Sequence, residues 1–147
     1  MVEHELEQLL RSKLKHKDDT TWAMLTADNG PLNSFYSKIA MGYALGIYNK
    51  GMHGDLNIVR NIRNAFAHSK KLIQFDHPAV VTELRKAAIP KKMWKSKGAD
   101  AILYISLCLR LSTKLTRMYI RRIKSRKYNP SPSEVVKALL SPGRATP

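Results

Sequence analysis

The amino-acid sequence predicts an all-α protein: a single helical-bundle domain of about five to seven helices, with a long basic helix near its C-terminus. Apolar residues recur at intervals of three and four along most of the chain, whereas alternation of apolar and polar residues is scarce. The 147 residues are enough for one domain around one core and too few for a second full domain. We expect the helical domain to span residues 1–127, followed at residues 128–147 by a short amphipathic segment and a C-terminal tail.

Four helical segments are expected before residue 70. The first runs from Glu3 to about Lys17, with acids near its start and bases near its end, as the helix dipole favours. A short one follows the N-cap residue types at residues 18–21. The third begins at Pro31, because proline suits a first turn, and the fourth begins near Asp55 as its N-cap. Their predicted apolar faces are Leu32, Phe35, Ile39, Tyr43 and Ile47 in the third helix, and Leu56, Val59, Ile62 and Phe66 in the fourth.

Small residues stand four apart in the third of these helices. Gly42 and Gly46 form one such pair, and Ala40 and Ala44 form another. Two glycines inside a helix cost about 1 kcal/mol each relative to alanine, so we expect them to serve the close approach of another helix. That helix could belong to the same chain or to another subunit. We therefore expect a homodimer or a larger assembly.

The second half of the chain is expected to contain a short helix, a basic loop and the long helix. The short helix follows the N-cap types of the turn FDHP, with Pro78 in its first position. The stretch KKMWKSKG at residues 91–98 is expected to be a loop, the long helix to run from about Ala99 to Lys127, and residues 133–140 to form the short amphipathic segment. The predicted apolar side of the short helix consists of Val80, Val81, Leu84 and Ala88.

The net charge of +15 is concentrated in the C-terminal part of the sequence. Up to Leu84 there are 10 basic and 9 acidic residues, whereas from Arg85 onward there are 16 basic residues and two acids. Like charges at this density repel one another, so a polyanion such as nucleic acid is a reasonable partner. The alternative is a basic surface that only keeps the protein in solution.

Five basic residues of the long helix recur at intervals of four and three and therefore fall within about 80° of arc. This basic stripe consists of Arg110, Lys114, Arg117, Arg121 and Lys124. Nucleic acid, either DNA or RNA, is the partner that the stripe favours, although an acidic protein or an anionic membrane surface would also match its charge. The residues that could extend this surface are Lys91, Lys92, Lys95, Trp94, Arg126 and Lys127. The predicted core face, opposite the stripe, consists of Ala101, Ile105, Cys108, Leu115, Tyr119 and Ile123.

The segment IRNAFAH at residues 62–68 places three polar side chains in an apolar run. Arg63 could bind a phosphate in a bidentate way, Asn64 could orient a ligand, and His68 could transfer a proton near neutral pH. Such a site could cleave RNA without a metal, because RNA supplies its own nucleophile. Arg63 and His68 diverge by about 140° on an ideal helix, so they converge only if the helix loosens at its end. The alternative is structural: the helix dipole favours His68, and Arg63 is a surface charge.

Three ordered motifs within residues 30–80 resemble the mannitol operon repressor (MltR) family: GPLNSFYSKIAMGYALG, DLNIVRNIRNAFAH and FDHP. This resemblance implies an all-helical fold and a role in transcriptional repression. The run RNAFAH is also similar to the R-x4-6-H signature of the HEPN superfamily, many of whose members are metal-independent ribonucleases that dimerise. The second resemblance implies that Arg63 binds phosphate, that Asn64 fills the polar position after it, and that His68 acts as the acid or base.

Three functions therefore stay open. The first is a non-enzymatic MltR-like regulator that contacts nucleic acid through the basic stripe. The second is a HEPN-type ribonuclease centred on Arg63, Asn64 and His68. The third is a protein-interaction module for an acidic partner.

Several other classes of protein are not expected. No stretch approaches the roughly 18 to 20 apolar residues of a membrane-spanning helix, and the N-terminal residues lack the features of a secretory signal. The one cysteine, Cys108, lies among apolar neighbours and is expected to be a buried thiol, so we expect a soluble protein of the reducing cytoplasm. His53 with Asp55 offers metal-ligand types without a helix-spaced pair, and His68 with Asp76 and His77 does the same, so no metal site and no cofactor are expected.

Overall fold

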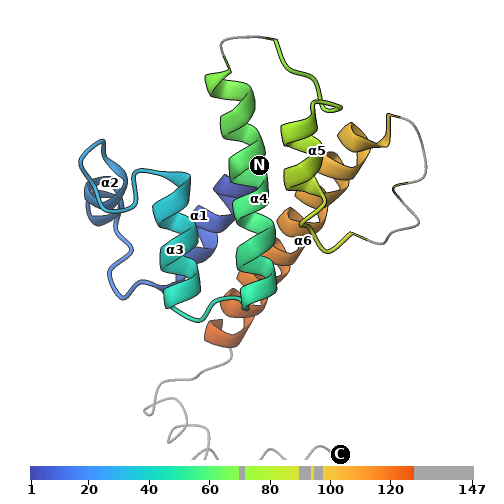
Figure 1. Cartoon of the computed structure of the whole chain (residues 1–147). Coiled ribbons are helices and arrows are strands. Elements are labelled where there is room, and N and C mark those ends of the chain that lie inside the picture. The colour runs from blue at the N-terminus through green and yellow to red at the C-terminus, as the bar shows by residue number, and fades with distance from the viewer. Residues whose placement is uncertain (70–71, 90–93, 95–97, 128–147) are drawn as a thin grey trace, which may run out of the picture.

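The computed structural model describes residues 1–69, 72–89, 94 and 98–127. The regular structure over these residues is helical, which confirms the prediction of a single all-α bundle (Figure 1). The helices are α1 (Val2–Lys13), α2 (Asp19–Thr26), α3 (Phe35–Ala44), α4 (Lys50–His68), α5 (Pro78–Leu84) and α6 (Ala99–Lys127). None of these described helices is long and apolar enough to cross a membrane.

The longest helix, α6, organises the bundle. It crosses behind α4 and α5, and α1 packs along it on the far side of the molecule (Figure 1). The shorter α3 lies between α1 and α4 and contacts both. In contrast, α2 stands at one edge and buries none of its residues (Figure 1).

The core is formed mainly by leucines of α1 and α6. In α1, Leu6, Leu9 and Leu10 are at most 1% exposed. They belong to one cluster with a column of leucines in α6 at every fourth position, namely Leu103, Leu107, Leu111 and Leu115. From α4, Leu56, Val59 and Ile62 are buried as predicted, and Phe66 packs against the cluster from its edge.

Local sequence signals predicted the N-cap of α2, the N-cap of α5 and the bounds of α6 correctly. Asp18 is the N-cap of α2, with its Oδ1 accepting from the Thr21 amide at 2.8 Å. His77 is the N-cap of α5, and Pro78 occupies its first position. The bounds predicted for α6 are also confirmed. The amphipathic segment predicted at residues 133–140 lies outside the described residues.

Several other predicted boundaries were wrong. The first helix ends at Lys13, because the chain turns back there and Arg11 Nη2 donates to the Lys17 carbonyl at 2.6 Å. The third helix begins at Phe35, since Ser34 and Ser37 form a capping box. Pro31 belongs instead to the turn before it, where the Leu32 amide donates to the Leu25 carbonyl.

The N-cap of α4 was also placed six residues too late, at Asp55. Asn49 is its N-cap, and Asn49 Oδ1 accepts from the Met52 amide at 3.0 Å. Gly51 and Gly54 lie inside the helix, because one good cap outweighs the modest helix penalty of glycine. Asp55 therefore lies inside α4, where it is only 7% exposed.

The small residues at positions 42 and 46 do not form one helix face, which corrects the prediction of close helix packing through them. A Cβ on Gly42 would lie 2.5 Å from Tyr48 Oη, so this glycine accommodates the Tyr48 ring of the same chain. Tyr48 Oη donates to the Ile39 carbonyl at 2.7 Å, which holds the ring across the end of α3. Gly46 lies beyond the helix with φ +62°, a conformation that favours glycine. Neither glycine therefore supports the predicted assembly of subunits.

The face of α6 that enters the core also differs from the predicted one. Of the predicted set only Leu115 is fully buried, whereas Ile105 and Ile123 are 53% and 37% exposed. The buried leucine column lies about 90° closer to the basic stripe. The prediction assumed that the core lies opposite the charges, but the leucines decide which face is buried. Two more expected core residues, Tyr43 of α3 and Ala88 after α5, are exposed as well.

We expect Gly42→Ala to lower the free energy of unfolding by about 1–3 kcal/mol, because the added methyl group would overlap the Tyr48 ring. Gly54→Ala in α4 is the matched control. A Cβ at Gly54 meets no atom within 4 Å, so this substitution should raise stability by up to about 1 kcal/mol through helix propensity. Urea unfolding followed by circular dichroism measures both. Changes of the same sign would contradict the packing role of Gly42.

Candidate functional site

The first residue of the basic stripe serves the fold. Arg110 Nη2 donates to Asp55 Oδ2 at 2.9 Å, and its Nη1 donates to the Ala88 carbonyl at 2.7 Å. The Ala88 amide donates to the other oxygen of Asp55 at 3.3 Å. Because a buried carboxylate is costly without partners, Arg110 is needed to compensate Asp55 and to join α4, α6 and the end of α5.

The other four members of the stripe are exposed. Lys114, Arg117, Arg121 and Lys124 make no ion pair or hydrogen bond within the part of the chain that the structure describes. They share one side of α6, beside the buried leucine column. The structure therefore leaves four uncompensated cations on one helix face. The predicted extensions Lys91, Lys92 and Lys95 lie outside the described residues, as do the side chains of Arg126 and Lys127, while Trp94 packs half-buried against the core.

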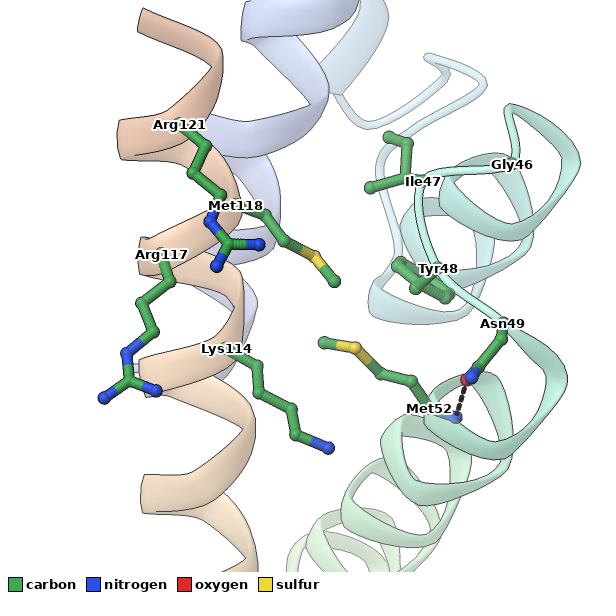
Figure 2. Close-up of a pocket in the computed structure, with 9 residues that line it drawn as sticks. All are labelled: Gly46, Ile47, Tyr48, Asn49, Met52, Lys114, Arg117, Met118 and Arg121. Carbon is green, nitrogen blue, oxygen red and sulfur yellow. Dashed lines mark hydrogen bonds between the residues drawn. The ribbon is translucent and has the colours of Figure 1, made fainter. Parts of the chain in front are cut away.

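Three of these cations line a cleft of about 630 Å³ between α6 and the turn from α3 to α4. Figure 2 shows Lys114 extending from α6 toward Met52, and the guanidinium of Arg121 lying beside Met118. Arg117 lies on the outer side of α6, at the edge of the cleft (Figure 2). The opposite wall consists of Gly46, Ile47, Tyr48, Asn49 and Met52. No acidic residue is among the nine described residues that line the cleft.

Sequence patterns alone found only one wall of this cleft. The helical spacing of the cations identified Lys114, Arg117 and Arg121. The opposing wall depends on a contact between segments about 70 residues apart, which no local pattern encodes. The N-cap type Asn49 was the only available signal that a helix turns at this place.

The segment IRNAFAH forms the C-terminal end of α4. The helix stays regular through His68, so it does not loosen in the way that would bring Arg63 and His68 together within one chain. Asn64 and His68 are exposed. Arg63 Nη1 donates to Glu3 Oε2 at 2.6 Å, which links α4 to α1.

Glu3 also belongs to a second ion pair. Lys38 is only 5% exposed, and its Nζ donates to Glu3 Oε1 at 2.8 Å and to Glu7. Partial burial alone would raise the pKa of the Glu3 carboxyl, but hydrogen bonds from Lys38 and Arg63 outweigh it and hold the pKa below its ordinary value. Arg63 is therefore part of a network that joins α1, α3 and α4, which is the structural alternative for this residue.

Two residues of metal-ligand type, His53 and Asp55, have other roles in the fold. The His53 ring stacks on Tyr43 with 4.5 Å between ring centroids, and its Nε2 lies 3.2 Å from Asn57 Nδ2. Asp55 is held by Arg110. Each of these groups already has a partner within the chain.

Comparison of the chain with protein-family models, with curated proteins and with solved structures found no match.

We expect Arg63→Ala to lower the free energy of unfolding by about 0.2–1 kcal/mol at neutral pH, because the Arg63 side chain is 60% exposed and its ion pair is screened. The folded state lowers the pKa of Glu3, so its contribution to stability is present above the ordinary value of 4.5 and lost as the pH falls through the folded value. The difference from the wild type should therefore shrink in acid. Asn64→Ala is the control: it should change stability only through helix propensity, and by the same amount at every pH. An Arg63 variant as stable as the wild type at neutral pH would argue against the structural role.

Proposed function

We propose that the protein is an MltR-like transcriptional regulator that contacts nucleic acid through the exposed basic face of α6 and catalyses no reaction. The observation that carries this proposal is the row of four uncompensated cations, Lys114, Arg117, Arg121 and Lys124. The row is about 15 Å long at the helical rise, a length of duplex axis over which each DNA strand carries about four phosphates. The motifs that resemble the MltR family support the regulatory role.

The pattern of charge favours a phosphate backbone over an ordinary solvated surface. Exposed helices in globular proteins usually alternate charges in mixed pairs at spacings of three and four. In α6 the one acidic residue is Asp100, in the first turn and far from the row. Contacts of this kind position a polyanion without reading its sequence, so they fit both DNA and RNA.

The proposal is tested by fluorescence anisotropy with labelled duplex DNA and single-stranded RNA across a salt series. The wild type should bind, and Arg117→Glu with Arg121→Glu should weaken binding about tenfold or more and reduce the salt slope by about two. Lys13→Glu with Arg85→Glu is the matched control, since it changes the net charge equally at exposed positions outside α6. If both double variants weaken nucleic-acid binding equally, the protein attracts nucleic acid through its overall charge, and the proposal is wrong. Absence of binding by the wild type would favour the acidic-protein partner instead.

The ribonuclease alternative is tested by incubating the same RNA with the protein in EDTA. We expect the RNA to stay intact, because Glu3 engages Arg63 and α4 keeps Arg63 and His68 apart. Gel electrophoresis of the RNA after incubation is the measurement. Cleavage that is lost in His68→Ala but kept in His16→Ala, a matched exposed histidine, would establish a HEPN-type ribonuclease and overturn the non-enzymatic assignment.

A further inference from the structure

The cleft between α6 and the α3–α4 turn combines two surfaces of different chemistry. One wall carries three cations without a neighbouring acid. The opposite wall is largely apolar: Tyr48 and Met52 are each 6% exposed, and Ile47 is half-buried beside them. Met118 adds a half-buried apolar side chain from α6. This apolar wall is the edge of the hydrophobic core where the core meets the cleft.

We propose that this cleft binds a nucleotide-sized organic phosphate, with the phosphate on Lys114 and Arg121 and the ring system against Tyr48, Met52 and Met118. Figure 2 shows Lys114 extending from α6 across the cleft toward Met52, and Arg121 running along α6 with its guanidinium beside Met118. An ammonium and a guanidinium suit a phosphate dianion, because the guanidinium binds two phosphate oxygens with its planar fork. Neither side chain is engaged by another group of the described chain.

The apolar wall suits a flat ring. Tyr48 Oη already donates to the Ile39 carbonyl, so Tyr48 offers its ring to the cleft and not its hydroxyl. Methionine side chains are flexible and polarisable, and their sulfur atoms contact aromatic rings favourably. Asn49 uses its Oδ1 to cap α4, which leaves its Nδ2 to donate to an acceptor on the ligand (Figure 2).

The size of the cleft is consistent with such a ligand. A volume of about 630 Å³ lies in the middle of the roughly 300–1,000 Å³ range of small-molecule sites. Inorganic phosphate alone would leave most of this space, and all of its apolar wall, unused. The ligand class is therefore a phosphate that carries a planar or apolar group.

Occupancy of the cleft would compete with nucleic acid. Lys114 and Arg121 belong both to the cleft and to the row of cations along α6, so a bound phosphate neutralises part of the nucleic-acid surface. The small phosphate would then act as a releasing effector. This competition rests on the proposed function, whereas binding of the small ligand does not.

The test is a titration of the full-length protein with AMP, adenosine and inorganic phosphate, followed by two-dimensional amide NMR. AMP should bind saturably and shift the amides of residues 46–52 and 114–121. Adenosine and inorganic phosphate should each bind at least about tenfold more weakly, because each loses one of the two walls. Arg121→Gln should weaken AMP binding about tenfold or more. Lys124→Gln, on the same helix face but not in the cleft, should weaken it less than about twofold.

Each outcome decides between the possibilities. No saturable AMP binding up to about 1 mM, inorganic phosphate binding as tightly as AMP, or equal weakening by the two variants would overturn the proposal. The wild-type shifts decide the question even if Arg121→Gln unfolds. AMP is then added to the protein bound to labelled DNA or RNA: release supports the competition, and AMP binding without release overturns the competition alone. If the protein binds no nucleic acid, the proposed function is wrong. The AMP titration then still shows whether the cleft binds an organic phosphate.

Discussion

The rotation of α6 about its own axis determines where almost every other group in this structure lies. The column Leu103, Leu107, Leu111 and Leu115 is packed against α1 and α4, and burial of four leucines stabilises the fold by several kcal/mol. With this face buried, Arg110 lies over Asp55, and the following cations lie beside the α3–α4 turn. The same rotation leaves Ile102, Ile105 and Leu109 exposed on the third side of the helix.

Two buried charges then connect the remaining helices. Asp55 joins α4 to α6 and to the end of α5, while Lys38 joins α3 to two carboxylates of α1. A buried charge without a partner would cost several kcal/mol, so each one requires specific neighbours and fixes how the helices pack. In the sequence, Arg63 was a candidate functional residue through the IRNAFAH motif, and Arg110 through the regular spacing of the basic stripe. Their observed partners are carboxylates of the same chain, which gives both a structural role.

The parts of the fold that were predictable from sequence are those that depend on neighbouring residues. The caps Asp18 and His77 and the long pattern of α6 are local signals, and the structure confirms them. The start of α4 was missed because Asn49 and Asp55 are both N-cap residue types, and only the tertiary pairing of Asp55 with Arg110 places Asp55 inside the helix. The buried face of α6 was missed for a different reason. Two apolar faces compete on this helix, and only the surface presented by α1 and α4 decides between them.

The four exposed cations of α6 do not stabilise the fold. Lys114, Arg117 and Arg121 lie on adjacent turns, where like charges at spacings of three and four repel by a few tenths of a kcal/mol for each pair. No acid of the described chain relieves this repulsion. Burial of the leucine column offsets it, so the helix forms although its exposed face is unfavourable. A bound phosphate group would remove the same repulsion, and the gain would be largest where two cations share one apolar-walled cleft.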